Sequence, residues 1–254
     1  MSIMTFDIGR VMSATFTVIS RHLVVFLGLS LIIAGMPYGL MQYFALNPDG
    51  LAAPFLDGMF DDVGDYWLTF IFAGTGMFFV YFILTILLQA MLIVATIRDM
   101  RSQDVDIGLC FAEAMKRFLP LIGLAILSLL GIMLGLMLFI VPGIILFLMW
   151  MVAAPVMVIE NLGITDSLKR SAELASGSKG MMFLLMIIFM IASGMLSGMA
   201  EGLGFFNSTA SVFLTIIAET AIAAVQAAGV AALYVELRTV KEGPFTDTLS
   251  DIFA

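Results

Sequence analysis

Six apolar runs constrain this sequence more than any other feature, because each is close to the length that crosses a lipid bilayer. A transmembrane helix needs about 20 apolar residues for a hydrocarbon core of about 30 Å. The runs cover residues 23–46, 67–97, 119–140, 142–159, 180–200 and 209–235. Composition agrees, since 62% of the residues are hydrophobic and 12% are charged, whereas soluble domains have about 25% charged residues. The sequence predicts an all-α polytopic membrane protein with about six transmembrane helices, forming one domain over residues 1–254.

A proline and a glycine separate the third run from the fourth. Pro142 removes a backbone donor and Gly143 tolerates a turn, so a tight reversal is favoured over one helix of about forty residues. The first run is preceded by a polar start of 22 residues, whereas a signal peptide begins with a short basic region. We therefore expect three hairpins, the first of which begins with a retained span.

Basic residues lie on one side of an alternating six-span path. The opposite loops contain none, and the first of them carries five aspartates between residues 47 and 66. Lys and Arg in short loops are retained in the cytoplasm, which predicts that both termini are cytoplasmic. The eleven basic residues are Arg10, Arg21, Arg98, Arg101, Lys116, Arg117, Lys169, Arg170, Lys179, Arg238 and Lys241.

Stretches with helical spacing precede the first, third and fifth spans, and they predict cytoplasmic amphipathic helices. Two of them align without gaps, since Asp7-Ile8-Gly9 matches Asp106-Ile107-Gly108 and the apolar positions that follow share one register. A looser third copy puts Leu168, Ser171, Ala172 and Ala175 on the same face, with Thr165 as the expected N-cap. The pattern suggests repeat units at 6–101, 104–160 and 164–241, although any membrane protein built of hairpins alternates in a similar way.

Residues for catalysis or metal binding are scarce. Cys110 is the only cysteine and His22 the only histidine, so one chain cannot build a disulfide or a Cys/His zinc site. There is no phosphate-binding glycine loop and no basic, aromatic strip for nucleic acid. The 21 methionines are spread over the spans, which favours a packing role over copper binding. We therefore expect no enzyme activity, no cofactor and no nucleic-acid partner.

One face of the sixth span is polar. Thr215, Glu219 and Gln226 share it at helical spacing, and a face of this kind is not expected to meet lipid. It predicts either a polar cavity or ion path, or a protonated Glu219 hydrogen-bonded to a neighbouring helix. Span five offers a partner surface with Ser193, Ser197 and Glu201 at steps of four.

Glycines repeat at steps of four in the fifth span. Gly194, Gly198 and Gly202 have the GxxxG spacing that lets two membrane helices approach closely. We expect this face to pack against span six or span two. Gly131 and Gly135 form a weaker instance in span three.

A carboxylate follows the apolar end of the fourth span. Glu160 would oppose the helix dipole at a cost of roughly 0.3 to 1 kcal/mol unless a cation neutralises it. Arg170 and Arg238 are the candidate partners on the basic side, and either pairing would make a cytoplasmic clamp. A solvated charge at the helix end is the alternative.

Two segments resemble a known family. The stretch from Val141 to Gly177 reads VPGIILFLMWMVAAPVMVIENLGITDSLKRSAELASG, and a second runs from Leu233 to Gly243 as LYVELRTVKEG. Both look like the bacterial membrane-domain family that is fused in some members to a glycerophosphoryl diester phosphodiesterase, with related stand-alone inner-membrane proteins. The resemblance implies a multi-pass module of the bacterial inner (plasma) membrane, linked in some cases to phospholipid-derived diester turnover. It does not imply phosphodiesterase activity, because the catalytic barrel would need a further soluble domain.

Two classes of function remain after these exclusions. The first is a non-catalytic integral membrane module that organises or assists a membrane or cytoplasmic protein partner, or senses lipid. The second is a small transporter or channel that uses the polar face of span six. A membrane-embedded enzyme acting on lipid phosphodiesters is least supported. The sequence leaves the ligand, the partner and the oligomeric state open.

Overall fold

All regular structure in the described part of the chain is helical. A computed structural model describes residues 6–46, 66–203 and 208–243. Six of its helical segments are long and apolar enough to cross a membrane: Leu23–Tyr43, Thr75–Met100, Phe118–Leu138, Ile140–Glu160, Lys179–Gly202 and Thr209–Glu242. The predicted fold class is therefore confirmed. The aspartate-rich segment 47–65 and the tail 244–254 lie outside the described residues.

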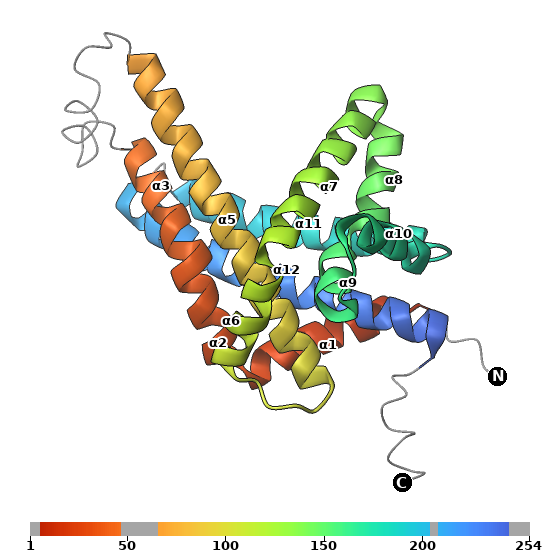
Figure 1. Ribbon diagram of the computed structural model, residues 1–254. Helices are drawn as coiled ribbons and strands as arrows, with labels where there is room; N and C mark the ends of the chain where they lie inside the picture. Colours follow the sequence, from red (N-terminus) through yellow and green to blue (C-terminus); the bar gives the residue numbers. More distant parts are fainter. Residues whose placement is uncertain (1–5, 47–65, 204–207, 244–254) are drawn as a thin grey trace.

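Three hairpins follow one another along the chain (Figure 1). The first is built from α2 (Leu23–Ser30), the π-helix η1 (Leu31–Gly35), α3 (Met36–Leu46) and α5 (Tyr66–Met100); the second from α7 (Phe118–Leu138), α8 (Ile140–Trp150) and α9 (Ala153–Glu160); the third from α11 (Lys179–Gly202) and α12 (Ser208–Glu242). Phe139 is extended and separates α7 from α8. The predicted reversal between spans three and four is thus present, three residues before Pro142.

An amphipathic helix precedes each hairpin. These helices are α1 (Ile8–Arg21), α6 (Ile107–Lys116) and α10 (Ile164–Ala175). Aligning their first residues also aligns Thr15, Ala114 and Ser171, all of which are buried. The shared register fits the repeat interpretation, which itself stays a prediction.

The expected N-cap of α10 is wrong by two residues. Gly163 takes the N-cap position in an extended conformation, while Thr165 lies inside the helix. Asp7 and Asp106 cap α1 and α6 by accepting hydrogen bonds from the backbone N–H groups of Gly9 and Leu109. At the third helix, the Ser167 hydroxyl donates to the Gly163 carbonyl at 2.7 Å. The chain therefore begins this helix without a side-chain cap.

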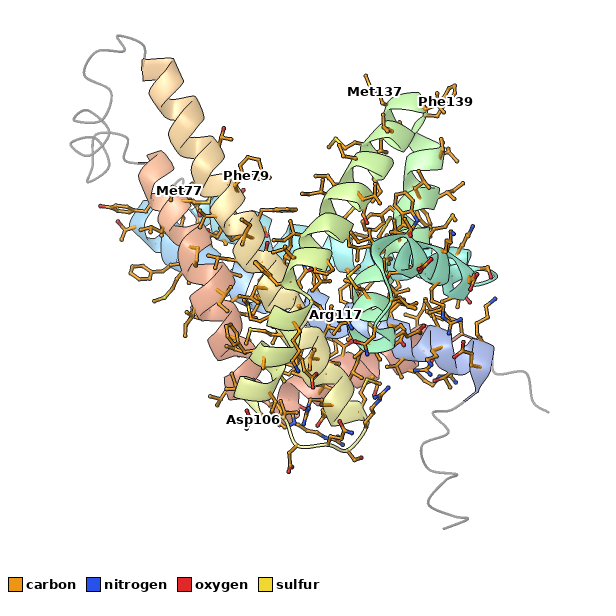
Figure 2. The ribbon with its side chains drawn as sticks, viewed as in Figure 1. Met77, Phe79, Asp106, Arg117, Met137 and Phe139 are labelled. Atoms are coloured by element: carbon orange, nitrogen blue, oxygen red, sulfur yellow. The ribbon has the colours of Figure 1, made fainter. Side chains whose placement is uncertain are left out.

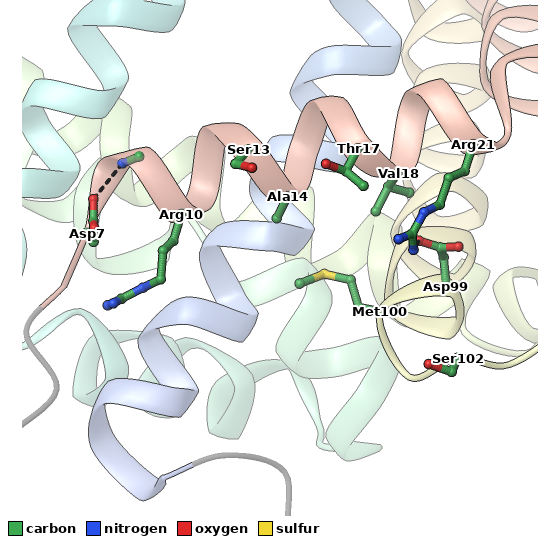
Figure 3. Close-up of a pocket in the computed structure, with 11 residues that line it drawn as sticks. Asp7, Arg10, Ser13, Ala14, Thr17, Val18, Arg21, Asp99, Met100 and Ser102 are labelled. Atoms are coloured by element: carbon green, nitrogen blue, oxygen red, sulfur yellow. Dashed lines mark hydrogen bonds and ion pairs between the residues drawn. The ribbon is translucent and has the colours of Figure 1, made fainter.

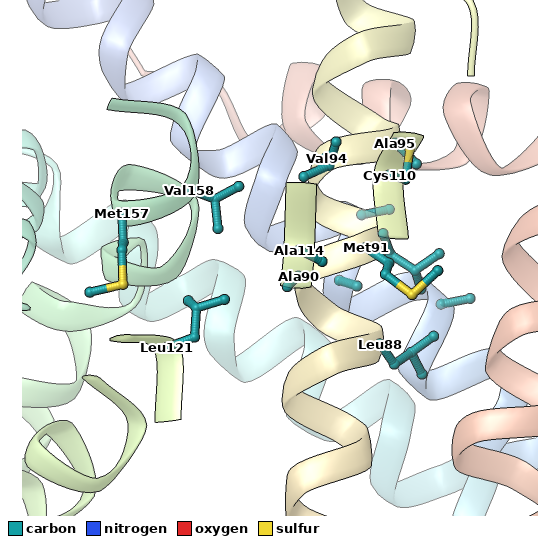
Figure 4. Packing of buried hydrophobic residues seen from close by; sticks show 14 of the residues in the cluster. Leu88, Ala90, Met91, Val94, Ala95, Cys110, Ala114, Leu121, Met157 and Val158 are labelled. Carbon is teal, nitrogen blue, oxygen red and sulfur yellow. The ribbon is translucent and has the colours of Figure 1, made fainter. Parts of the chain in front are cut away.

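The core lies toward the end of the molecule that carries the basic residues. Every residue of α5 from Ala90 to Ile97 is buried, as are Ala231 to Tyr234 of α12. Figure 4 shows Ala90 and Val94 on the side of α5 that faces Leu121 and Val158 of the second hairpin, and Ala224 and Ala228 of α12 belong to the same cluster of buried residues. These contacts join all three hairpins at the basic end.

Toward the opposite end, apolar side chains are exposed. Met137 and Phe139 at the α7–α8 reversal are 88% and 72% exposed, and Figure 2 shows them far from Arg117 at the base of α7. Such a surface would promote aggregation in water, but it suits hydrocarbon. Figure 1 shows the α7–α8 hairpin diverging from α3 and α5 in this direction. The second hairpin is joined to the first at the basic end and separates from it toward the other end.

Glycines allow close contact at several places, but not on the predicted stripe of α11. A Cβ at Gly35 would lie 2.8 Å from the Ile216 carbonyl oxygen of α12, and one at Gly135 would lie 3.0 Å from the Gly143 Cα. By contrast, a Cβ on any glycine of the predicted α11 stripe (Gly194, Gly198, Gly202) would meet no atom within 4 Å. The expected packing of this stripe against span six or two is therefore wrong for the described chain. The reason is rotational: Met182, Leu185 and Ala200 are buried on the opposite face of α11.

Replacing Gly35 by alanine should lower stability, whereas the same change at Gly198 should not. The added methyl of Gly35→Ala meets a backbone carbonyl that cannot move aside, and overpacking of this kind costs about 1 to 3 kcal/mol. Gly198→Ala enters open space and gains about 1 kcal/mol of helix propensity. Thermal melting in detergent measures both. Equal melting temperatures for the two variants would contradict the close η1–α12 contact.

Candidate functional site

Ionic contacts join the even-numbered spans to the amphipathic helices. Asp99 at the end of span two, Glu160 at the end of span four and Glu236 near the end of span six each face a basic side chain of α1 or α10. The three carboxylates are 10%, 18% and 9% exposed. We call these contacts the charged layer.

Two of the acids hold the two ends of α1. Arg10 Nε lies 3.1 Å from both carboxylate oxygens of Glu236, and the Asp7 N–H donates to Glu236 Oε1 at 3.1 Å. The hydrogen bond to Glu236 raises the pKa of Arg10. At the other end of the helix, His22 Nε2 lies 2.9 Å from Asp99 Oδ1 and Arg21 lies 3.4 Å from Asp99 Oδ2. A pocket lies beside α1, and Figure 3 shows Arg10 and Arg21 at its opposite ends.

The third acid belongs to the predicted clamp. Arg170 Nε donates to Glu160 Oε2 at 3.0 Å, and the Tyr234 hydroxyl donates to Glu160 Oε1 at 2.9 Å. Arg170 also pairs with Glu242, whose Oε2 accepts a hydrogen bond from Arg238 Nε at 3.0 Å. The predicted Glu160–Arg170 contact is present, and Glu242 links Arg238 to the same cluster.

Sequence reasoning missed Tyr234 and Glu242. Both share a face of α12 with Arg238, because the three residues follow one another at steps of four. That spacing was the sequence signal from which Tyr234 and Glu242 could have been found. Burial lowers the pKa of Arg170, but hydrogen bonds to Glu242 and Glu160 outweigh this effect and raise it overall. Arg170 therefore stays charged throughout the physiological range.

The three residues predicted to form the polar face of span six lie in three different environments. Thr215 is buried and donates to the Ser211 carbonyl of its own helix at 2.8 Å. Glu219 is half-buried and hydrogen-bonded to Ser197 of α11. Gln226 is exposed and faces a cavity whose lining includes neither of the other two. Ser197 of α11 is thus a neighbour of Glu219, while the protonated state of Glu219 stays a prediction.

The cavity beside Gln226 has a volume of about 640 Å³ and lies between α5, α7, α8, α9, α11 and α12. We call it the intramembrane cavity. Four uncharged polar side chains enter it from four helices, and most of the remaining lining is apolar: the polar ones are Gln89, Ser128, Ser193 and Gln226. None of its lining residues among those described is charged.

These four polar residues lie at a similar depth. Along their helices they are 9 to 14 residues from the basic residues Arg98, Arg117, Lys179 and Arg238. At 1.5 Å per residue this is about 14 to 21 Å, near the middle of a hydrocarbon core of about 30 Å. Within the described ranges, no hydrogen bond joins the side chain of any of the four to another protein group. An unpaired polar group at this depth is costly, so the arrangement suits a ligand that pairs with it.

Residues suited to metal binding or nucleophilic catalysis do not form a cluster in the described part of the chain. No group of three His, Cys, Asp or Glu side chains there is placed to hold a metal ion. Cys110 is buried in α6, and burial raises the pKa of its thiol. A thiol of this kind is unreactive at neutral pH.

A double-mutant cycle should show coupling between Glu160 and Arg170. Because both side chains are mostly buried, Glu160→Gln and Arg170→Gln should each cost about 2 kcal/mol, more than an exposed pair would. The double variant should be less destabilised than the sum of the two single effects. Denaturant or thermal unfolding in detergent measures the cycle, with Lys169→Gln on the exposed side of α10 as the control. Additive effects would mean that the two residues do not interact.

Comparisons with known proteins found no match. No protein-family model, no curated protein and no solved structure matches this chain. The resemblance to the phosphodiesterase-associated membrane domains therefore rests on the two motifs quoted above. What the structure shows is a multi-pass membrane protein with six candidate spans.

Proposed function

We propose that this protein is a non-catalytic integral membrane module that holds an uncharged, lipid-derived amphiphile in the intramembrane cavity. The observation that supports this proposal most strongly is that four polar side chains from different helices line one largely apolar cavity: Gln89, Ser128, Ser193 and Gln226. Binding sites for small molecules commonly combine an apolar lining with a few placed polar groups and have volumes of about 300 to 1,000 Å³. The cavity fits this description.

The polar groups indicate the chemistry of the ligand. Amide and hydroxyl side chains both donate and accept hydrogen bonds, as is needed to pair with the ester carbonyls and free hydroxyl of a diacylglycerol. A charged group would find no counterion among the lining residues. An uncharged lipid is therefore favoured over a phospholipid headgroup at this depth.

Access from the bilayer supports a lipid ligand. Two apolar side chains of the lining, Met190 and Phe147, are 61% and 38% exposed. Both belong to membrane spans, so the surface that they share with the cavity meets hydrocarbon rather than water. A ligand from the membrane would enter without crossing the charged layer.

The sidedness of the basic residues supports one orientation of this module in the membrane. With Lys and Arg retained on the cytoplasmic side, the charged layer and the amphipathic helices face the cytoplasm and both termini lie there. The sequence resemblance favours the bacterial inner membrane and a link to phospholipid-derived diester turnover. A small transporter or channel is less supported, because Glu219 and Thr215 are not part of the cavity lining that contains Gln226.

Filling the cavity should weaken binding of a diacylglycerol. Ser128→Trp places a large side chain in the cavity, whereas Leu134→Trp lies on the same helix at a position that is 67% exposed. We expect a diacylglycerol with a photoreactive acyl chain to label wild type and Leu134→Trp equally. Labelling of Ser128→Trp should fall about tenfold, as expected if about 1.4 kcal/mol of binding free energy is lost.

Peptide mapping by mass spectrometry locates the label, and thermal melting shows that both variants are folded. The proposal is supported if the label lies near Gln89 and Gln226 in the wild type and is reduced when Ser128→Trp fills the cavity. Labelling that Ser128→Trp leaves unchanged would contradict it.

A further inference from the structure

A second pocket lies at the basic end, between α5, α6 and α9. Its volume is about 470 Å³, and four basic side chains surround it. We call it the basic pocket. Its charged and polar lining consists of Arg98, Arg101, Gln103, Glu113, Lys116, Arg117 and Asn161.

Positive charge accumulates here against the trend of the whole chain. The protein has 11 basic residues and a formal net charge of −8, yet four of the 11 line this one pocket. Glu113 is the only acidic residue in the lining. It lies 3.5 Å from Arg98, so the lining holds four basic side chains and one carboxylate.

Neutral acceptors orient two of the guanidinium groups. Arg98 Nε donates to the backbone carbonyl of Asp104 at 3.1 Å, and Arg117 donates to the side-chain oxygen of Asn161. Asn161 is the left-handed C-cap of α9, with φ +56°, and this conformation positions its side chain at the end of span four. Such contacts fix the direction of the guanidinium groups without neutralising them.

The pocket also has an apolar floor. Val94 and Ile97 of α5 lie opposite Val158 and Ile159 of α9. The basic rim stands where spans two, three and four reach the membrane surface, since Arg98 ends span two and Arg117 directly precedes span three. Charge at the surface over an apolar floor matches the two parts of a phospholipid.

We infer that the basic pocket binds the phosphate group of an anionic phospholipid. Guanidinium and ammonium groups bind phosphate oxygens through charge-assisted hydrogen bonds, and basic pockets between spans on the cytoplasmic side are suited to anionic headgroups. A free phosphate ion would use the same rim but not the apolar floor. The site is separate from the intramembrane cavity and does not rest on the function proposed above.

The test uses the full chain in detergent and three probes: dioctanoyl phosphatidylglycerol, dioctanoyl phosphatidylcholine and inorganic phosphate. Lys116→Gln combined with Arg117→Gln removes two charges from the pocket. Lys169→Gln combined with Lys179→Gln removes two charges from the same side outside it. Lys116→Gln alone provides a milder variant, since this side chain is exposed and its loss leaves the Arg117–Asn161 contact intact. Thermal melting and native mass spectrometry measure binding.

Phosphatidylglycerol should bind wild type and the Lys169/Lys179 control with equal affinity, and more tightly than phosphatidylcholine. The Lys116/Arg117 variant should bind it about 30-fold more weakly, since each of the two basic residues contributes about 1 kcal/mol near a membrane surface. Lys116→Gln alone should show part of this loss. Equal losses in the pocket variants and the control would overturn the inference, as would unchanged affinity in both pocket variants. Binding of inorganic phosphate as tight as that of phosphatidylglycerol would overturn the lipid source.

Discussion

The pairing of span-end carboxylates with cations on the amphipathic helices is the constraint on which the rest of this structure depends. Apolar side chains supply little drive for helices to associate inside a bilayer, because lipid tails are as apolar as the side chains. Hydrogen-bonded charge pairs at the membrane surface can supply what hydrocarbon packing does not. Glu236 and Asp99 hold α1 across the ends of spans six and two, and Glu160 holds α10. The charged layer thus joins parts of the chain that are up to 226 residues apart in sequence.

The second hairpin is joined to the first at one end and has room to separate from it at the other. The buried parts of α5 and α12 lie close to the charged layer, whereas the α7–α8 reversal is exposed. The intramembrane cavity lies between these regions, where the second hairpin departs from α5 and where α11 and α12 form a further wall. Its polar side chains come from all three hairpins. The divergence of the second hairpin exposes apolar side chains to lipid. It also leaves the intramembrane cavity, which uncharged polar side chains line.

Much of this architecture could be predicted from sequence, because hydropathy and helical spacing are local properties. The six spans, the reversal near Pro142 and the three amphipathic helices follow from runs of residues alone. The Glu160–Arg170 contact could also be anticipated, since a carboxylate at a helix C-terminus needs a cation. The α11 glycines show the limit of such reasoning. Their spacing permits close packing, but which face of a helix meets a neighbour depends on its rotation in the assembled bundle, and here the buried face is the opposite one. The intramembrane cavity was hidden for the same reason, because Gln89, Ser128 and Ser193 become neighbours of Gln226 only after the hairpins pack.

Hydrogen exchange along α1 tests the central role of the charged layer most directly. Glu236→Gln combined with Asp99→Asn removes both acids that hold this helix, while Glu160 and α10 are left unchanged. The account predicts slow exchange of the amides of residues 8–21 in the wild-type protein and much faster exchange in the double variant. Peptides from residues 164–175 should exchange at the same rate in both proteins. Unchanged protection of α1 after the loss of both carboxylates would contradict the claim that the charged layer holds the amphipathic helices in place.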